Sequence, residues 1–260
     1  MTYYQVKELW RYPVKSMGGE ELESVAVTER GLAGDRAYAL YDTTRGEVAS
    51  ASKVRKFPDM LFWNARLEAD GALRVTAPDD TPRSVEELCA AFGPDVALLA
   101  ASPAAVQLAF SPGALEKPLP ASAGGQPGTL FDYAGIHIVS AATLRALAAA
   151  YPEGNFSSER FRPNLVIDSE TAVPFAENNW VGRTIAIGPE VRVQITLPCP
   201  RCVMATLAHR TLPHDPRILR TAADQNTRFI EGLGDQPCVG AYGEIVRGGN
   251  LRLGHSFHVL

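Results

Sequence analysis

The sequence predicts a mainly β protein with a few helices, of the α+β class. Its apolar stretches are short and are separated by turn-forming residues, with 22 glycines and 19 prolines among 260 residues. Only two or three stretches have the i, i+3, i+4, i+7 apolar spacing of an amphipathic helix. No internal repeat is visible. Barrels therefore explain this pattern better than a doubly wound parallel sheet does.

Strand signals dominate the first hundred residues, with one helix among them. Asp70-Gly71 lies between two apolar runs and predicts a hairpin with a two-residue turn. Ser84 followed by Glu87 has the pattern of a capping box, which predicts that a helix begins there. The strands that we expect in this part cover residues 25–27, 38–41, 61–67 and 73–75.

A change of composition separates this part from the rest. Eight of the nineteen residues from Ser111 to Thr129 are Pro or Gly, which indicates a linker. After it, a strand at 136–139 runs into an amphipathic helix at 140–151. The further elements that we expect are strands at 165–167, 184–187, 191–197 and 203–207, a helix at 216–230, and strands at 239–246 and 251–259.

Composition and charge exclude several classes of protein. Hydrophobic residues make up 46% and charged residues 21% of the chain, as in an ordinary globular protein. The net charge of −4 offers no basic surface for a nucleic acid polymer. Since the N-terminus resembles no targeting segment and no apolar run suits a bilayer, we expect no membrane association. We expect a cytoplasmic protein whose four cysteines are reduced.

Cys199-Pro200-Arg201-Cys202 is the most reactive-looking stretch of the chain. A thioredoxin-type pair should open a helix, whereas a strand is expected after Cys202. Ordinary buried cysteines remain an alternative, although Arg201 beside Cys202 favours the thiolate that attacks electrophiles or binds soft metals. A structural zinc site needs four ligands. The residues that could complete one are Cys238 and either His209 or His214.

Two turns near the N-terminus could bind an anion. In the first, Tyr12 to Ser16, Pro13 restricts the backbone and Lys15 and Ser16 follow it. The second runs from Gly31 to Arg36, where the glycines permit close approach of the backbone to a ligand. A structural ion pair between Asp35 and Arg36 explains the second turn almost as well.

A third candidate precedes the strand expected at 165–167. Arg160, Arg162 and Asn164 cluster there, and two guanidinium groups with an amide can hold a phosphate or another planar anion. Ser140 is most simply the N-cap of the helix that follows it. The N-terminus of that helix could also bind an anion.

Together these motifs resemble the MOSC family of molybdenum-cofactor proteins. The two N-terminal turns resemble the MOSC N-terminal β-barrel domain, and the resemblance extends to the mitochondrial amidoxime-reducing component and to bacterial hydroxylaminopurine reductases. The motifs that resemble the MOSC domain itself are Phe161–Asn164, Phe175–Trp180 with Gly182, and Cys199–Cys202.

The resemblance implies two β-barrel domains, at 1–112 and 113–260, that bind a pyranopterin–molybdenum (molybdopterin) cofactor. It implies that Cys202 ligates molybdenum and is the catalytic residue. The cofactor would be bound by Lys15, Ser16, Arg36, Ser140, Arg162, Asn164, Arg201 and Cys202.

The implied reaction is reduction of the N–O bond of a small N-hydroxylated substrate. Some relatives carry an iron–sulfur domain, but this chain has no such cysteine pattern and ends at Leu260, so we expect a separate flavoprotein or ferredoxin as electron donor. Two alternatives stay open. Cys202 could carry a persulfide for sulfur transfer, or the protein could be a non-catalytic carrier of the cofactor.

Overall fold

The computed structural model describes residues 3–102, 105–113, 117–121 and 127–260. The chain forms two compact units. The first, here the barrel unit, consists of Met1–Trp10, Glu21–Ala33 and Ala134–Leu260, and the second unit consists of Arg11–Glu20 and Gly34–Tyr133. Each unit is therefore built from segments that alternate along the chain, whereas the sequence predicts two domains that meet at a single boundary. As a boundary between sequence domains, 112/113 stays a prediction.

Seven strands of the barrel unit form a closed ring. The pairing of the last strand with the first, at Ile136↔Gly243, closes the ring. β12 and β13 are parallel, so the chain between them crosses over through helices, and the other pairs in the ring are antiparallel. In ring order the strands are β12 (Ile136–Ser140), β13 (Leu165–Asp168), β1 (Tyr4–Arg11), β19 (Ser256–Val259), β14 (Thr184–Ile187), β15 (Val191–Pro200) and β17 (Gly234–Arg247).

Alternation of apolar residues puts the core inside this ring. Val191, Val193 and Ile195 of β15 are fully buried while the residues between them are only half-buried, which is the period of two that a strand imposes. The same core includes Ile185 and Phe257. Smaller strands add to the unit: β2 (Glu20–Glu21), β16 (Thr227–Ile230), and a three-stranded sheet of β18 (Gly249–Arg252), β3 (Ser24–Thr28) and β4 (Gly31–Leu32).

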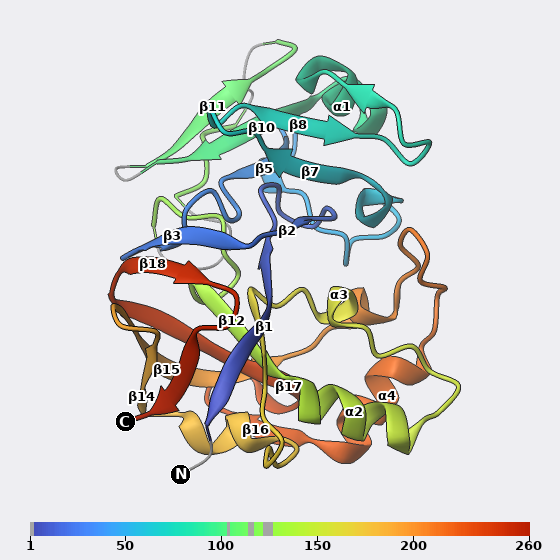
Figure 1. Ribbon diagram of the computed structural model, residues 1–260. Coiled ribbons are helices and arrows are strands. Elements are labelled where there is room, and N and C mark those ends of the chain that lie inside the picture. The colour runs from blue at the N-terminus through green and yellow to red at the C-terminus, as the bar shows by residue number, and fades with distance from the viewer. Residues whose placement is uncertain (1–2, 103–104, 114–116, 122–126) are drawn as a thin grey trace. The chain divides into compact units, whose positions relative to one another are not determined.

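Two helices lie side by side against one flank of the barrel (Figure 1): α2 (Ala141–Ala150) and α4 (Arg217–Gln225). Leu147 and Ile218 belong to one apolar cluster with Phe161, the last residue of α3 (Ser158–Phe161). Short 3-10 helices complete the unit, η2 (Ala176–Trp180) and η3 (Val203–Thr206).

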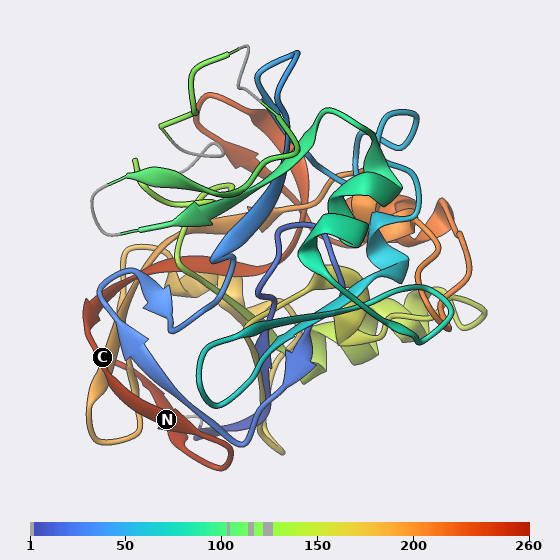
Figure 2. The ribbon, with the colours of Figure 1, turned by 90° about the horizontal axis from the view of Figure 1, so that it is seen from above.

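The second unit is built of two sheets and one helix. One sheet has the order β11-β10-β5-β6 and the other β7-β8-β9. Figure 2 shows the green β10 and β11 pair, and the teal helix α1, which contacts β10. Its elements are β5 (Tyr38–Asp42), β6 (Glu47–Val48), η1 (Met60–Phe62), β7 (Asn64–Leu67), β8 (Leu73–Thr76), β9 (Pro82–Arg83), α1 (Val85–Phe92), β10 (Val96–Ala101) and β11 (Val106–Phe110).

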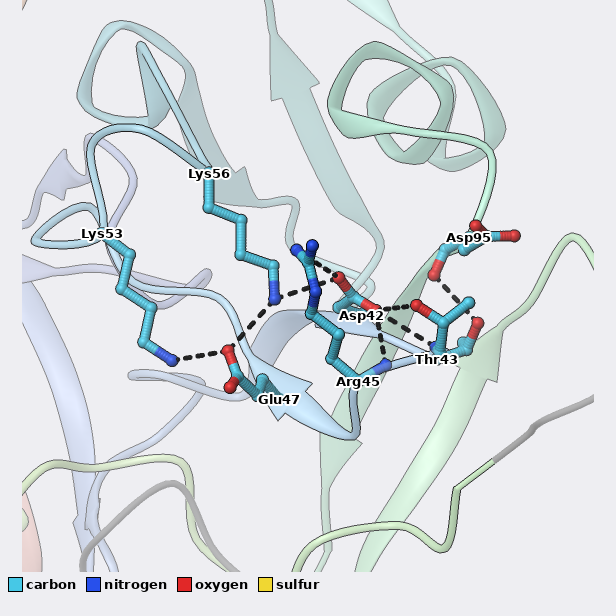
Figure 3. A network of polar contacts seen from close by, with 8 residues as sticks. Asp42, Thr43, Arg45, Glu47, Lys53, Lys56 and Asp95 are labelled. Atoms are coloured by element: carbon cyan, nitrogen blue, oxygen red, sulfur yellow. Dashed lines mark hydrogen bonds and ion pairs between the residues drawn. The ribbon is translucent and has the colours of Figure 1, made fainter.

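A network of charged residues holds the β5–β6 hairpin in the second unit (Figure 3). Burial opposes ionisation of Asp42, but hydrogen bonds from Arg45 N and Thr44 and the ammonium of Lys56 outweigh it and lower the pKa of Asp42 to about 2. Lys56 also pairs with Glu47, at 3.1 Å. These charged groups satisfy one another and connect the hairpin to the segment that follows it, and we assign them a structural role.

The predicted fold class is confirmed, since strands dominate the described residues and form a closed barrel. The capping box is confirmed as well: Ser84 Oγ accepts from Glu87 N at 3.2 Å, and the Glu87 carboxylate accepts from Ser84 N at 2.7 Å. In the described part of the chain, no helix combines the length and apolar character that crossing a bilayer requires. The expected linker lies partly outside the described residues, at 114–116 and 122–126.

Three local predictions were wrong. The helix expected at 216–230 ends at Gln225, because Thr227–Ile230 finds backbone partners on β17 and becomes β16. The strand expected at 203–207 is the 3-10 helix η3. The β7–β8 connection is a five-residue loop, closed by the bond from Glu68 N to Ala72 O, rather than a two-residue turn.

Gly240 and Gly182 provide a matched test of the barrel's packing. Both have positive φ, 80° and 79°. A Cβ on Gly240 would lie 2.5 Å from the carbonyl oxygen of Ile138, whereas nothing lies within 4 Å of a Cβ on Gly182. We expect Gly182→Ala to lower the free energy of unfolding by about 1 kcal/mol, the cost of left-handed backbone, and Gly240→Ala by more than about 4 kcal/mol, because backbone must also move. Equal shifts in urea denaturation would contradict this.

Candidate functional site

The Cys199–Cys202 stretch joins the end of a barrel strand to a 3-10 helix. Cys199 lies in β15 and is fully buried, while Cys202 is the N-cap residue of η3 and is exposed. All four cysteines are free thiols, and Cys202 is the exposed one among them. Because a thiol must reach its reactant, Cys202 is the cysteine of this chain that can attack an electrophile or bind a metal from solvent.

The guanidinium of Arg201 points at Cys199. Its Nη1 donates to Cys199 Sγ at 2.9 Å and its Nη2 donates to the carbonyl oxygen of Phe161 at 3.0 Å. The sequence places Arg201 beside Cys202 along the chain and suggests that its charge favours the Cys202 thiolate. Tertiary packing directs both terminal nitrogens elsewhere, because they satisfy acceptors inside the protein. The remaining nitrogen, Nε, is buried and has no hydrogen-bond partner.

Cys199 and Cys202 therefore have different chemistry. Burial raises the pKa of the Cys199 thiol, although Arg201 opposes this effect. A buried thiol of this kind is inert towards solvent reagents. Cys199 is buried, as expected of an ordinary core cysteine, but its sulfur also accepts a hydrogen bond from the Arg201 guanidinium.

Arg160 has a structural environment. It is 1% exposed, and its three nitrogens donate to four backbone carbonyl oxygens from two separate segments. Those acceptors belong to Asn155, Ala205, Leu207 and Pro213. Arg160 thus attaches the chain that follows Cys202 to the start of α3, and its guanidinium is not available to a ligand.

Arg162 ends α3 in a left-handed conformation, with φ of 53°, and its N–H donates to Ser158 O at 3.0 Å. It is buried, at 6% exposure. Asn164, two residues on, is committed to the backbone of neighbouring strands. Its Oδ1 accepts from His137 N at 3.0 Å and its Nδ2 donates to Trp10 O at 3.3 Å. Asn164 therefore joins β1, β12 and β13, and a role in cofactor binding stays a prediction.

The N-terminus of α2 is already occupied by a carboxylate of the chain itself. Ser140 caps the helix through its Oγ, which accepts from Ala142 N at 3.2 Å. Ser140 N donates to Glu177 at 2.7 Å, and Thr143 Oγ1 donates to the other carboxylate oxygen at 2.8 Å. The helix dipole favours a negative group at this place. Contact of Ser140 with a cofactor stays a prediction, but its N-cap role is observed.

Glu177 is a residue that sequence reasoning missed. It is 1% exposed, and burial raises the pKa of its carboxyl above the usual value, although the bonds from Ser140 and Thr143 oppose this. The one feature of the sequence that could have indicated Glu177 is its position within Phe175–Trp180, a stretch that was identified only by its resemblance to the MOSC domain. Through the hydrogen bonds of Glu177 with Ser140 and Thr143, this stretch caps the N-terminus of α2.

His209 is a second residue whose role the sequence did not indicate, since the sequence suggests it only as a zinc ligand. It lies in the turn after η3, where its backbone exchanges hydrogen bonds with Leu212 at 2.9 and 2.8 Å. Burial and the charges of Arg162 and Arg160 lower the pKa of His209 to about 4. The imidazole is therefore neutral at pH 7. In the described part of the chain, no three His, Cys, Asp or Glu side chains form a metal-binding group, so the zinc site considered above is not found there.

The second unit brings together its own predicted residues. Arg36 N donates to Tyr12 O, and Lys15 N donates to Tyr38 O, both at 2.8 Å, so the two turns run side by side. The Asp35 carboxylate pairs with the Arg36 guanidinium, and Arg36 lies over the Tyr12 ring with 4.7 Å to its centroid. The structural ion pair considered from the sequence is thus observed.

Lys15 has a carboxylate partner. Its Nζ forms an ion pair with Asp132 and donates to Leu130 O at 3.3 Å. The side chain of Asp132 is 55% exposed while that of Lys15 is 7% exposed. An anion that approached Lys15 would compete with Asp132 for the ammonium.

Left-handed backbone marks three of the predicted binding residues. Seven non-glycine residues in the described part of the chain have positive φ, and Ser16, Arg36 and Arg162 are among them. Such a conformation costs of order 1–3 kcal/mol and persists where the surrounding structure imposes it, often at ligand clamps. The strain is consistent with a binding role for these three residues.

The low pKa of His209 predicts a pH dependence of stability. Between about 4 and the usual 6.5, the unfolded chain binds a proton that the folded protein does not. The free energy of unfolding should therefore fall as the pH is lowered through this range, by up to about 3 kcal/mol. His209→Gln should remove this slope in urea denaturation at pH 4–7, and His214→Gln, at an exposed position, should keep it. Equal slopes for wild type and His209→Gln would show that another group is responsible.

Comparison with known proteins identifies the family. The chain matches the MOSC N-terminal beta barrel domain over residues 3–97 and the MOSC domain over residues 126–258. It is 28% identical over 243 residues to a molybdenum cofactor sulfurase of Drosophila grimshawi, an alignment that covers 84% of this chain and 30% of that protein. The chain thus spans less than a third of that relative's length.

Two similar solved structures are the YuaD protein of Bacillus subtilis and YiiM of Escherichia coli. YuaD is 10% identical, with 99% of this chain and 95% of that chain covered and a TM-score of 0.47. YiiM is 11% identical, with 100% and 70% covered and a TM-score of 0.40. On the strength of the two domain matches, the chain belongs to the MOSC family, with an N-terminal MOSC barrel domain followed by a MOSC domain.

Proposed function

We propose that this protein binds a molybdenum–pyranopterin cofactor and reduces the N–O bond of small N-hydroxylated compounds. The observation that carries the proposal is an exposed thiol at Cys202 whose chain neighbour, Arg201, is a buried cation. Membership of the MOSC family and similarity to a molybdenum cofactor sulfurase support the choice of cofactor.

The residues of the barrel unit fit an anionic group of this kind. Arg201 is buried, and in the described part of the chain it forms no ion pair with a carboxylate. Arg201 Nε is a buried donor that no protein atom satisfies. Buried cations of this kind favour a ligand that brings negative charge. A soft thiolate from Cys202 suits a soft transition metal.

Cys202 would hold the metal and Arg162 would hold phosphate. The family pattern also assigns Lys15, Ser16 and Arg36 of the second unit to cofactor binding, and Ser140, Asn164 and Arg201 of the barrel unit. The contacts described above favour structural roles for Ser140 and Asn164. When bound, the cofactor would supply a centre that exchanges two electrons with the substrate.

The net reaction balances with an external reductant. An N-hydroxylated amine or amidine takes up two electrons and two protons, its N–O bond breaks, and the products are the amine or amidine and water. We propose that a separate flavoprotein or ferredoxin-type protein supplies the electrons. His209 is neutral at pH 7 and therefore adds no positive charge near Arg162.

Substitution of the exposed thiol, Cys202, tests whether it is the metal ligand. Wild type, Cys202→Ser and Cys89→Ser are expressed in a host that makes molybdopterin, and molybdenum, pterin fluorescence and amidoxime reduction with an artificial one-electron donor are measured. We expect near-stoichiometric molybdenum in wild type and in Cys89→Ser, whose changed cysteine lies in the second unit. We expect loss of molybdenum and activity in Cys202→Ser, because this variant lacks the thiolate that is proposed to hold the metal. Wild type without molybdenum would refute the proposal, and bound cofactor without activity would indicate a carrier.

Sulfur transfer is the second candidate function. Similarity to a protein named molybdenum cofactor sulfurase favours it, as does the accessibility of Cys202. A persulfide on Cys202 would form when a donor persulfide transfers its outer sulfur to the Cys202 thiolate and leaves as a thiolate.

This candidate predicts a specific mass change. After incubation with a cysteine desulfurase and cysteine, the intact protein should gain the mass of one sulfur atom, and Cys202→Ser should not. The gain should disappear with a reducing thiol, because the added sulfur forms a labile S–S bond. No mass gain in wild type, or an equal gain in Cys202→Ser, would exclude sulfur transfer through Cys202.

A further inference from the structure

A single buried side chain connects the two segments of the barrel unit that carry Cys202 and Arg162. Arg201 is the residue before Cys202, and its Nη2 donates to the carbonyl oxygen of Phe161, the residue before Arg162. That carbonyl belongs to the last turn of α3, where oxygens have no partner within the helix. Arg201 thus satisfies the end of α3 at the point where the left-handed Arg162 follows.

Cys199 anchors the other side of the same guanidinium. Its sulfur accepts from Nη1 at 2.9 Å, and Cys199 is fully buried near the end of β15. The guanidinium is planar and rigid, so the acceptors on Nη1 and Nη2 together determine its orientation. Because Arg201 is 8% exposed, water does not readily replace either acceptor.

We propose that Arg201 and Cys199 are positioning residues that hold Cys202 in place relative to Arg162, and that neither of them ligates the metal. The inference rests on the proposed function, since it gives Cys202 and Arg162 one common ligand. It adds a positioning role through Nη1 and Nη2 to the cofactor contact expected of Arg201 from the sequence, and that contact is left to Nε. It also makes Cys199 more than an inert core residue.

The alternative is that Cys199 only fills space in the core, and Cys238 separates the two cases. Cys238 is also fully buried, on the adjacent strand β17, and its sulfur lies 3.4 Å from Gln236 O. Truncation to alanine removes the same sulfur atom from the core at either position. Removal of Cys199 also leaves Arg201 Nη1 without its acceptor.

The experiment compares Cys199→Ala, Cys199→Ser, Cys238→Ala and Arg201→Lys with wild type. Each is purified from a host that makes molybdopterin, and three quantities are measured: the midpoint of thermal unfolding, molybdenum per chain, and the half-time of pterin release after dilution. We expect release from Cys199→Ala to be about tenfold faster than from Cys238→Ala, the size of effect that one hydrogen bond supports, at similar unfolding midpoints.

The conservative variants test the mechanism. Cys199→Ser should release pterin nearly as slowly as wild type, because a hydroxyl oxygen also accepts from Nη1. Arg201→Lys should release it as fast as Cys199→Ala, since an ammonium is a point charge without the planar fork that reaches both acceptors. Equal release from Cys199→Ala and Cys238→Ala would overturn the inference.

Failures can be told apart. Wild type that holds no molybdenum refutes the proposed function, whereas wild type that holds it with no difference among the cysteine variants refutes only the positioning role. Should Cys199→Ala not fold, Cys199→Ser and Arg201→Lys decide. Slow release of pterin from Cys199→Ser with fast release from Arg201→Lys supports the inference, and equal release from these two variants overturns it.

Discussion

Two buried guanidinium groups hold together the chain around Cys202. Arg160 and Arg201 donate to five backbone carbonyl oxygens and one sulfur, and these acceptors lie on segments that are distant in sequence. Burial of a charge is expensive, and hydrogen bonds satisfy every nitrogen of these two guanidinium groups except Arg201 Nε. The positions of α3, Arg162 and the turn that contains His209 depend on these contacts.

A buried carboxyl group lies elsewhere in the barrel unit. Glu177 accepts from Ser140 N and Thr143 Oγ1 at the N-terminus of α2, where the helix dipole is positive. Arg145, midway along α2, pairs with Asp168 at 2.9 Å. The N-terminus of α2, the helix in the crossover from β12 to β13, is therefore satisfied by the protein itself.

Backbone strain and side-chain charge coincide in two of the residues that the sequence predicts to bind a cofactor. Arg162 follows α3 with positive φ, and Arg36 has positive φ between the ion pair to Asp35 and the ring of Tyr12. Neither conformation is favourable for a β-unbranched L-residue on its own. Each is imposed by hydrogen bonds of the same residue's N–H, to Ser158 O and to Tyr12 O. The conformations that place these two guanidinium groups therefore lower the stability of the fold.

The sequence by itself determined the class of fold, most of the strands and the start of α1, because alternation and capping are local patterns that the neighbouring residues complete. It also indicated Cys202 and the Arg162 segment as candidate functional residues, which stays a prediction. Only the tertiary structure decided that Arg160 is structural, since its guanidinium donates to backbone carbonyl oxygens from across the fold. It likewise decided that Thr227–Ile230 forms a strand and that Arg201 points at Cys199, because both outcomes depend on partners supplied by β17 and by β15 and α3. No local pattern encodes such long-range partners, which is why the sequence could name the reactive stretch but not the contacts that orient it.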